Sequence, residues 1–348
     1  MKYIYFSDFH AHNFSEFSTP DAKFGTSRLR HQVEVLEYLF KQAKDTSSVL
    51  LFGGDLFHQR NSVDTRVFNA VFGVFARYSD VTVVMIRGNH DSVNNSITSP
   101  SSIEPFEELP NVSVVTGCEV KKVGTDTITC ISYGDEVEDM KKFIKEHPAT
   151  LLMAHIGVDG SRSGAYSHSL GGAFTKADLY NNNYQAVLLG HYHERQMLFP
   201  NGGYVGNTVP MSFNDDGETK GYWTFETSDS GKTLKNDISY VPIVSPKFMT
   251  LDLQNLPDDY EDVVKHNFVR VRGTKKQVDK LSLALTTDDT EKDQLESNLR
   301  MEVIPEAVTE NRLDLKTTAN PVEITSTWAK KFMPDKETLL VSLIKSVI

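Results

Sequence analysis

Five short apolar segments of this chain end in polar residues of the kind that bind metal ions. The clearest is AVLLGHYHE, residues 186–194, in which four apolar residues lead through a glycine to two histidines one residue apart. A run of this length is typical of a strand covered on both faces, as in a parallel or mixed sheet flanked by helices. His191 and His193 follow the carboxyl end of that strand, where open α/β sheets usually place ligands. One such pair is weak evidence, because two polar loop residues would look the same.

Four other segments have the same design. Each contains a short apolar run followed by polar residues, which are Asp8 and His10, then Asp55 and His58, then Asn89, His90 and Asp91, and finally His155. Core histidines satisfied by chance hydrogen bonds would not be expected to share this placement. The five segments together therefore favour an α/β fold with a metal site over a set of unrelated buried histidines.

The order of these blocks resembles that of the calcineurin-like metallophosphoesterases. Along the chain they read DxH, GD, GNHD, a single H and GHxH; each block is common alone, but the series is specific. The resemblance covers residues 1–245 well and the remainder loosely. It implies an α/β protein built on a two-layer β-sandwich with helices outside.

Within this superfamily, GDLFH and GNHD look most like the DNA repair nucleases of the SbcD or Mre-eleven type, and the bacteriophage recombination endonuclease subunits look closest. Serine/threonine phosphatases of the superfamily carry GDxxDRG, and Phe57 and His58 do not fit that pattern. Residues 205–223 also resemble the glycine-polar turn and KG strand of the nucleases. The resemblance therefore implies a DNA exonuclease and endonuclease. A small-molecule phosphodiesterase or phosphatase that uses the same metals is the alternative, and a scaffold without activity would be expected to lack some of the ligands.

The residue types fit a pair of metal ions. Hydrolysis of a phosphodiester needs a hydroxide and a stabilised leaving group, and two cations about 3.5–4 Å apart provide both. Asp55 is the candidate bridge between the two ions. We expect Asp8, His10 and His193 on one ion and Asn89, His155 and His191 on the other. Carboxylate, amide and imidazole without thiolate favour manganese, iron or a similar ion, and the resemblance implies manganese, with magnesium as a second option.

His90 is the candidate general acid. It stands beside a proposed ligand and is followed by Asp91, which could orient the imidazole and favour the charged form that protonates a leaving oxygen. The resemblance gives the GNHD histidine this role or that of positioning the phosphate. Alternatively, His90 and Asp91 only buttress the ligand loop. His58 either contacts the phosphate or packs beside the metals, and His12 is expected to be an ordinary surface or loop residue.

The net charge of −11 argues against a protein that binds DNA unaided, because such proteins normally carry a basic patch. The basic residues that follow the first two ligand blocks could face the active-site groove, although solvated loop charges would give the same pattern; they are Lys23, Arg28, Arg30, Arg60 and Arg66. A partner that supplies DNA affinity is the simplest resolution. The resemblance names an SbcC or Rad-fifty type coiled-coil ATPase, in a complex with two copies of each subunit.

A chain of 348 residues exceeds what one core usually supports. We expect a nuclease domain over residues 1–244, a small α/β DNA-capping domain over 245–320, and a C-terminal helical segment over 321–348 that docks on the ATPase. Periodicity predicts a helix over 64–80. In the family the matching helix builds a homodimer with a second helix, here about 102–109; a helix buried entirely within its own chain is the alternative.

No stretch approaches ~18 consecutive apolar residues, so no membrane-spanning helix is expected. The first ten residues lead straight into a proposed ligand, which favours a strand over a signal peptide. We therefore expect a cytoplasmic protein, in the host cytoplasm if phage-encoded. Cys118 and Cys130 flank a predicted hairpin and are expected to stay reduced there.

Overall fold

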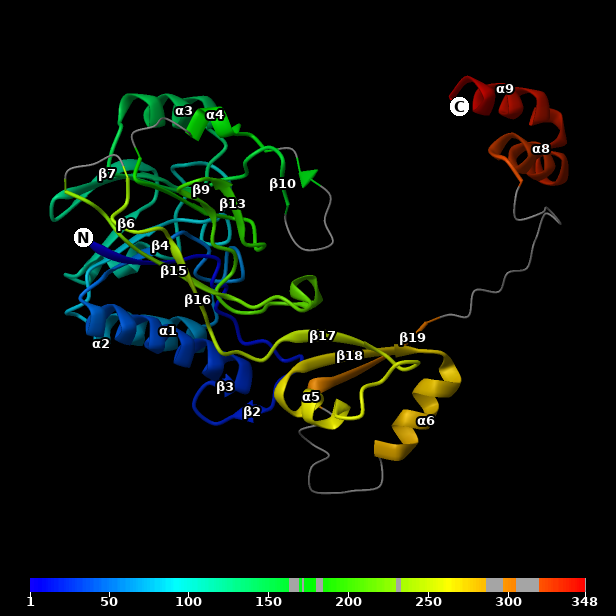
Figure 1. Cartoon of the computed structure of the whole chain (residues 1–348), viewed down its shortest axis with the longest axis horizontal. Coiled ribbons are helices and arrows are strands. Elements are labelled where there is room, and N and C mark those ends of the chain that lie inside the picture. The colour runs from blue at the N-terminus through cyan, green and yellow to red at the C-terminus, as the bar shows by residue number, and fades with distance from the viewer. Residues whose placement is uncertain are drawn as a thin grey trace. The chain divides into compact units, whose positions relative to one another are not determined.

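The computed structural model describes residues 1–162, 169–170, 172–179, 184–229, 233–285, 297–304 and 319–347. The chain divides into two compact units, Met1–Val303 and Ile304–Ile348. The larger unit contains both main sheets and is shown with the smaller unit in Figure 1.

The first main sheet has six strands in the order β16–β15–β1–β4–β5–β6. Strands β1, β4, β5 and β6 run parallel, whereas β15 and β16 are antiparallel to their neighbours. The carboxyl ends of β1, β4 and β5 therefore meet at one edge. The strands are β1 (Lys2–Phe6), β4 (Val49–Phe52), β5 (Val83–Ile86), β6 (Val112–Val115), β15 (Gly221–Glu226) and β16 (Ser239–Pro242).

The second main sheet also has six strands, in the order β13–β14–β12–β9–β8–β7. Strands β8, β9, β12 and β14 are parallel, and β7 and β13 form antiparallel edges. The two free cysteines, Cys118 and Cys130, lie on the β7–β8 hairpin. The strands are β7 (Cys118–Val123), β8 (Asp126–Ile131), β9 (Leu151–His155), β12 (Ala186–Gly190), β13 (Gln196–Phe199) and β14 (Gly202–Tyr204).

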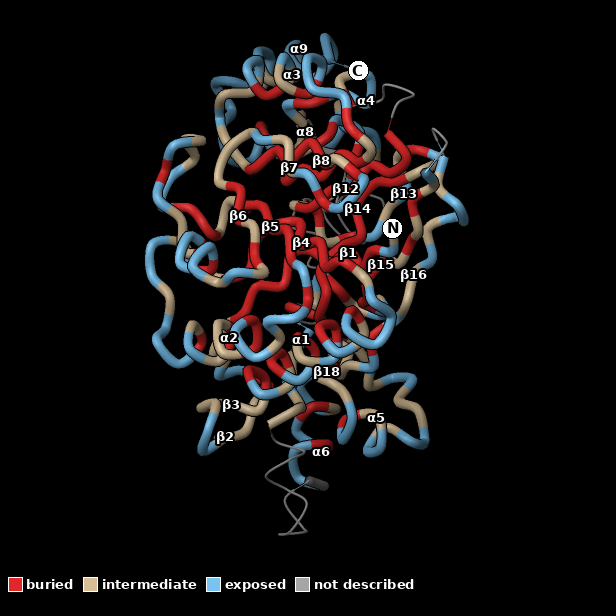
Figure 2. Tube along the Cα trace, turned by 90° about the vertical axis from the view of Figure 1, so that its left-hand side faces the viewer, coloured by how far each residue is buried: buried red, intermediate tan, exposed pale blue. Residues whose placement is uncertain are grey.

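The two sheets pack face to face, with helices on both outer sides (Figure 1). Alternation along β1 sends Tyr3 and Tyr5 into the core between the sheets, and Ile4 and Phe6 toward α1 (Ser27–Thr46) and α2 (Thr65–Arg77). Helices α3 (Val137–Glu146) and α4 (Lys176–Leu179) cover the second sheet. Figure 2 shows the central strands as buried. The predicted two-layer sandwich flanked by helices is confirmed.

The helix predicted over residues 64–80 is α2. Asp64 caps it by accepting hydrogen bonds from the backbone N–H groups of Arg66 and Val67 at 2.8 and 3.2 Å. Phe68 and Phe72 are half-buried and stack on each other. They also contact Phe106 of η1 (Glu104–Glu108), a 3-10 helix. The helix expected at about 102–109 is η1, a short 3-10 helix that is closed by bonds between residues three apart.

A small α/β module follows the sandwich. Its three parallel strands are in the order β17–β18–β19, and Val264, Val269, Val271 and Leu281 form its own core. The module belongs to the larger compact unit, and the predicted domain boundaries at 244 and 320 remain predictions. Its elements are β17 (Phe248–Asp252), α5 (Tyr260–His266), β18 (Phe268–Gly273), α6 (Lys275–Leu285) and β19 (Leu299–Val303).

The second unit is a pair of packed helices, α8 (Pro321–Phe332) and α9 (Glu337–Val347), joined by η3 (Pro334–Lys336). Asn320 and Glu323 form a reciprocal capping box at the start of α8. Trp328, Leu339 and Leu343 remain largely exposed. No helix in the described ranges is long and apolar enough to cross a membrane.

Short two-stranded ribbons complete the larger unit. One pairs β2 (Pro20–Asp21) with β3 (Gly25–Thr26), and the other pairs β10 (Ser161–Arg162) with β11 (Ser169–Leu170). A single 3-10 turn, η2 (Phe213–Asp215), precedes β15. The ribbon β2–β3 lies directly before α1, in the loop that follows the first proposed ligands.

Candidate metal centre

The strand ends of both sheets bring the seven proposed ligands together. Asp8 and His10 follow β1, Asp55 follows β4, and Asn89 follows β5. His155 is the last residue of β9, and the remaining two ligands, His191 and His193, follow β12. Both layers of the sandwich therefore contribute side chains to one centre.

The first group of ligands lies around His10. The Nε2 atom of His10 is 3.1 Å from Nε2 of His193. Ligand atoms of Asp8, His10 and His193 lie within 4.8 Å of one another, so one ion could contact all three. These are the three residues expected on the first metal.

The second group lies around Asn89. Its Oδ1 atom is 3.1 Å from Nε2 of His155 and 2.9 Å from Nδ1 of His191. Asp55 lies between the two groups, because its Oδ2 atom is 3.6 Å from Nε2 of His10 and 3.5 Å from Nε2 of His155. That position suits a carboxylate that bridges two cations.

The chemistry of this donor set fits divalent metal ions. Asp8 and Asp55 are 0% and 2% exposed, and among the described residues neither forms an ion pair with a lysine or arginine. Buried carboxylates without a cationic partner are costly. Two cations held by these seven side chains would remove that cost, and the mixture of oxygen and imidazole nitrogen suits a borderline ion.

Burial and mutual charge set the protonation of these ligands. Burial lowers the pKa of His191 to about 3 and that of His10 well below its usual value, which leaves both rings neutral, the form that binds metals. Burial opposes the charge of Asp55, but His155 and His10 outweigh it and lower the pKa of that carboxyl. Burial alone would lower the pKa of His155, yet the Asp55 carboxylate raises it to about 9.

The ligand loops adopt a backbone that ordinary residues rarely take. Asp8, His10, Asp55 and His191 have φ values of 51°, 49°, 61° and 108°. Such angles cost energy for residues with a Cβ atom and persist only where surrounding contacts fix them. Backbone bonds do so here: the N–H of Asp8 donates to Gly54 at 2.9 Å, and the N–H of His191 donates to the Asp8 carboxylate at 3.0 Å.

Two glycines of the motifs are required by close approach. A Cβ atom at Gly88 would overlap the carboxylate and backbone nitrogen of Asp55. One at Gly190 would overlap Oγ of Ser7 and the carbonyl of Gly53. Gly88 of GNHD therefore lets the loops after β4 and β5 of the first sheet approach, and Gly190 of GHxH lets the two sheets approach at the centre.

The sequence suggested that Asp91 could orient the His90 ring, but the structure gives the Asp91 carboxylate other partners. Its carboxylate accepts hydrogen bonds from the backbone N–H groups of Asp55, Leu56, Phe57 and Gly88 at 2.8 to 3.1 Å. Burial, followed by the charge of Asp55, raises the pKa of Asp91 to about 6. The physical reason for the difference is that four backbone donors surround this carboxylate. Asp91 is a positioning residue for the loop that carries the candidate bridge.

His90 is fixed from the other side. Its Nδ1 lies 2.5 Å from the carbonyl of His58, and because a carbonyl can only accept, Nδ1 carries the proton. Its backbone N–H donates to Oδ1 of Asp55 at 2.7 Å. The ring lies 4.8 Å from that of His10, so Nε2 is left for a ligand near the first metal group.

His58 and His12 extend the histidine cluster outward. The His58 ring stacks on His90 at 5.8 Å, and burial, then the charges of His12 and His90, lower its pKa to about 4. His12, expected to be an ordinary surface or loop residue, lies 5.3 Å from His58 and 4.8 Å from Phe14. The sequence signal for this position is that His12 lies two residues after His10, the same spacing as in HxH.

Residues 205–223 support the ligand loops. Lys220, only 4% exposed, contacts Oδ1 of Asp215 at 2.8 Å and donates to the carbonyl of His193 at 3.2 Å. The Thr208 hydroxyl donates to the carbonyl of Ser7 at 2.7 Å. This segment thereby joins the loop after β1 to the loop after β12, a role that the motif alone did not reveal.

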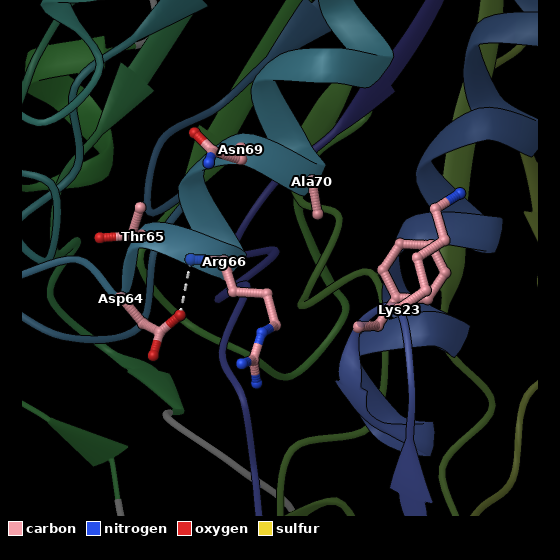
Figure 3. Close-up of a pocket in the computed structure, with 7 residues that line it drawn as sticks. Lys23, Asp64, Thr65, Arg66, Asn69 and Ala70 are labelled. Atoms are coloured by element: carbon pink, nitrogen blue, oxygen red, sulfur yellow. Dashed lines mark hydrogen bonds between the residues drawn. The ribbon is translucent and has the colours of Figure 1, made fainter.

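The basic residues near the site have different partners. Arg28 is buried and lies over Phe14 at 4.1 Å, and Arg30 pairs with Asp21 at 3.3 Å. Nε of Arg60 donates to the carbonyl of Asn89 at 2.6 Å. Lys23 and Arg66 instead line a cavity of about 600 Å³ at the start of α2, together with Asp64, Thr65 and Asn69 (Figure 3).

Fold and site together define a metal-dependent phosphoesterase. Residues 1–195 match the calcineurin-like phosphoesterase family, and since this is more than half of the chain, the chain belongs to that family. Its members typically bind two divalent metal ions. No curated protein matches the chain. Among solved structures, a hypothetical protein from Thermus thermophilus is 13% identical, with a TM-score of 0.40 over 70% of this chain and 99% of that chain.

Proposed function

We propose that this phosphoesterase is a DNA nuclease, the nuclease subunit of a recombination and double-strand-break repair complex of the SbcCD type. The observation that carries the proposal is the stacked pair His58 and His90 beside the first metal group. These rings come from GDLFH and GNHD, the two blocks that resemble the nucleases, and GDLFH departs from GDxxDRG of the phosphatases at Phe57 and His58.

The chain's own residues support a division of roles. Two divalent cations, manganese by resemblance with magnesium second, would polarise the phosphate and activate water. Asp55 holds the two ligand groups together. His90, in its charged form, donates its Nδ1 proton to the carbonyl of His58 as a hydrogen bond and transfers its Nε2 proton to the leaving oxygen, which leaves the ring neutral. His58 stacks beside it and contacts the phosphate.

Partners follow from the exposed apolar surfaces. Trp328 and Phe332 of α8 and Leu339 and Leu343 of α9 are exposed apolar side chains, which suit docking of the SbcC or Rad-fifty type coiled-coil ATPase that the resemblance implies. The half-buried Phe68 and Phe72 of α2 suit a homodimer contact. Such an ATPase would supply DNA affinity that a chain of net charge −11 lacks.

The test is cleavage of end-labelled single-stranded and double-stranded DNA beside a chromogenic phosphodiester, with manganese, magnesium or chelator. Native protein is compared with His90→Ala, and metal content is measured for both. We expect manganese-dependent DNA cleavage that falls at least about 100-fold in His90→Ala with metal retained, the usual range for loss of general acid catalysis.

Two results would contradict the proposal. Rapid turnover of the small ester without DNA cleavage, even with a coiled-coil ATPase added, would indicate a small-molecule phosphodiesterase. Loss of metal from His90→Ala would mean that His90 buttresses the ligand loop and is not the acid. His147→Ala, at an exposed position on the far end of α3, is the control and is expected to keep full activity.

A further inference from the structure

A second cavity lies directly beside His90. It has a volume of about 230 Å³ and two walls. The loop after β4 provides Gln59, Asn61, Ser62 and Val63. The loop after β5 provides the other wall through residues 90–93 and 100–102, and His90 belongs to that wall. A ligand in this cavity would therefore lie against His90.

The wall after β5 is held by its own hydrogen bonds. Ser92 and Ser101 form a β-bridge, and the N–H of Val93 donates to the carbonyl of Pro100 at 3.2 Å. The hydroxyl of Ser101 donates to the carbonyl of Asp91 at 3.0 Å. This side of the cavity is preorganised, so little ordering is needed when a ligand enters.

The wall after β4 offers polar groups that are not used elsewhere. Gln59, Asn61 and Ser62 are exposed, and among the described residues none of their side chains forms a hydrogen bond. Asn61 has a φ of 65°, so the chain turns sharply at that position. Two amides and a hydroxyl can both donate and accept, which suits a ligand with a mixed edge of donors and acceptors.

The cavity also has apolar surface on both walls and almost no charge. Val63 stands on one side, and Val93, 51% exposed, stands with Pro100 on the other. The carboxylate of Asp91 is occupied by four backbone N–H groups, so it does not offer a free charge. The cavity at Lys23 and Arg66 is the opposite case, with two cations on its lining (Figure 3).

We propose that the cavity beside His90 binds an unpaired nucleobase, that of the nucleotide on the leaving side of the cut phosphodiester. A base has apolar faces and a polar edge, which match Val63 and Val93 and the side chains of Asn61 and Ser62. His90 protonates the leaving oxygen under the proposed function, on which this inference rests. The nucleoside attached to that oxygen then lies on the His90 side, where the cavity is.

The consequence is a preference for nucleotides that can leave the duplex stack. A base reaches the cavity freely in single strands, frayed ends and flaps, whereas a paired base must first be extruded. Binding through a neutral base also gives an acidic chain a source of substrate affinity that does not depend on positive charge.

The test uses a labelled single-stranded oligonucleotide with one abasic residue, and the cleavage rate is measured at each bond. For native protein we expect about a tenfold loss at the bond whose leaving-side nucleotide is abasic, within the range measured for base stacking, and no loss when the abasic residue is on the other side. The variant Asn61→Gly/Ser62→Ala removes the polar edge while glycine keeps the positive φ. It is expected to lose about tenfold on normal DNA and nothing further on abasic DNA.

Controls separate binding of the base from other effects. The matched variant Asn236→Gly/Ser239→Ala makes the same two changes in a different cavity and is expected to behave as native. A chromogenic ester without a base is expected to be cleaved equally by all proteins. Gln59→Ala, an exposed single change that leaves the turn intact, is expected to lose about threefold on normal DNA only.

Three outcomes overturn the inference. In the first, the abasic residue slows cleavage as much in the Asn61→Gly/Ser62→Ala variant as in native protein. In the second, native protein cuts DNA but the abasic residue does not slow it. In the third, the variant cleaves the base-free ester more slowly than native protein does. The second outcome leaves the nuclease proposal intact. Failure of native protein to cut any DNA would overturn both.

Discussion

Asp55 and Asp91 have different functions at the metal centre, although both are buried carboxylates. Asp55 reaches a histidine of each ligand group, at 3.6 and 3.5 Å. Among the described residues Asp91 forms no hydrogen bond with a ligand side chain; its carboxylate instead accepts from three N–H groups of the Asp55 loop and from that of Gly88. Because the φ of Asp55 is 61°, that loop needs outside support. A residue outside the proposed ligand set therefore helps to fix where the candidate bridging carboxylate lies.

The first prediction concerns Asp91→Asn. An amide keeps one acceptor oxygen but turns an NH₂ group toward backbone donors, so it cannot satisfy all four. We expect the free energy of unfolding to fall by about 1–3 kcal/mol and manganese affinity to weaken about 10- to 100-fold. Denaturant unfolding and manganese titration measure the two effects. Asp80→Asn, at an exposed surface pair, is the control; unchanged manganese affinity in Asp91→Asn would contradict the positioning role.

The second prediction concerns pH and the buried pair of Asp215 and Lys220. Burial alone would raise the pKa of Asp215, but Lys220 outweighs it and the pKa is lowered. A carboxyl whose folded pKa lies below its unfolded value, about 3.9, stabilises the fold above that pH and loses this contribution as the pH falls through the folded pKa. We expect native protein to lose stability steeply below about pH 4.

Asp215→Asn should remove this part of the pH dependence. At pH 7 it leaves Lys220 with Glu218 as its one anionic partner in the described part of the chain, and we expect the free energy of unfolding to fall by about 1–3 kcal/mol. Melting temperatures measured from pH 3 to 7 compare the two proteins. If the variant and native protein lose stability in parallel below about pH 4, Asp215 is not responsible for the effect.

At the scale of elements, apolar runs predict the strands because both sheets are covered on both faces. Residues 49–58 and 151–157 contain β4 and β9 for this reason. The ends of parallel strands meet at one edge, so the proposed ligands could be grouped from sequence before any coordinates. The assignment of individual side chains to two metals stays a prediction.

What the sequence could not predict depends on distant parts of the chain. Three of the four backbone partners of Asp91 are about 35 residues away, and GNHD places it beside His90 only along the chain. Lys220 lies 27 residues from the carbonyl that it supports. Residues 104–108 span little more than one turn, and so short a segment has no periodicity that separates a 3-10 helix from an α-helix.

The third prediction belongs to the ribbon β2–β3 and helix α2, which bring Lys23 and Arg66 to one cavity (Figure 3). Under the nuclease proposal these two cations contact backbone phosphates near the cut. For Lys23→Ala/Arg66→Ala we expect weaker binding of single-stranded DNA and a salt-dependence slope that is smaller by about 1.4, from about 0.7 per phosphate contact. Binding is measured across a series of salt concentrations.

The control also removes two positive charges, but at the C-terminal ends of α1 and α2. Lys44→Ala/Arg77→Ala deletes two cations of α1 and α2 that are already paired with Asp80 and Glu37. We expect its salt dependence to match that of native protein. Equal slopes for both variants would mean that the Lys23 and Arg66 cavity does not meet DNA phosphates.

At the scale of the molecule, the acidic net charge and the division into two compact units both bear on how the protein binds its partners. The chain carries a net charge of −11, and the basic side chains Arg28 and Arg60 are engaged within the protein. All proposed ligands lie in the unit Met1–Val303, whereas the unit Ile304–Ile348 carries exposed apolar side chains. Catalysis and partner binding are therefore expected to be separable by mutation.

The fourth prediction tests that separation with Leu339→Ser/Leu343→Ser in the full chain. Both leucines are more than half exposed, at 58% and 52%, so the change removes little packing within the protein. Burying each leucine against a partner contributes about 1.5–3 kcal/mol, so affinity for a coiled-coil ATPase should fall about 100-fold or more. Manganese-dependent cleavage by the nuclease alone should be unchanged, because no proposed ligand lies in α9.

Co-purification and a binding titration with the ATPase measure the first effect, and cleavage of labelled DNA measures the second. Lys336→Ser/Lys345→Ser, with two exposed polar positions in η3 and α9, is the control and is expected to bind the ATPase as native protein does. If the leucine variant binds the ATPase as tightly as native protein does, the apolar face of α9 is not the ATPase-binding surface. Loss of cleavage by the isolated variant would mean that the two units are not independent, and the acidic chain would then need α9 for its own catalysis.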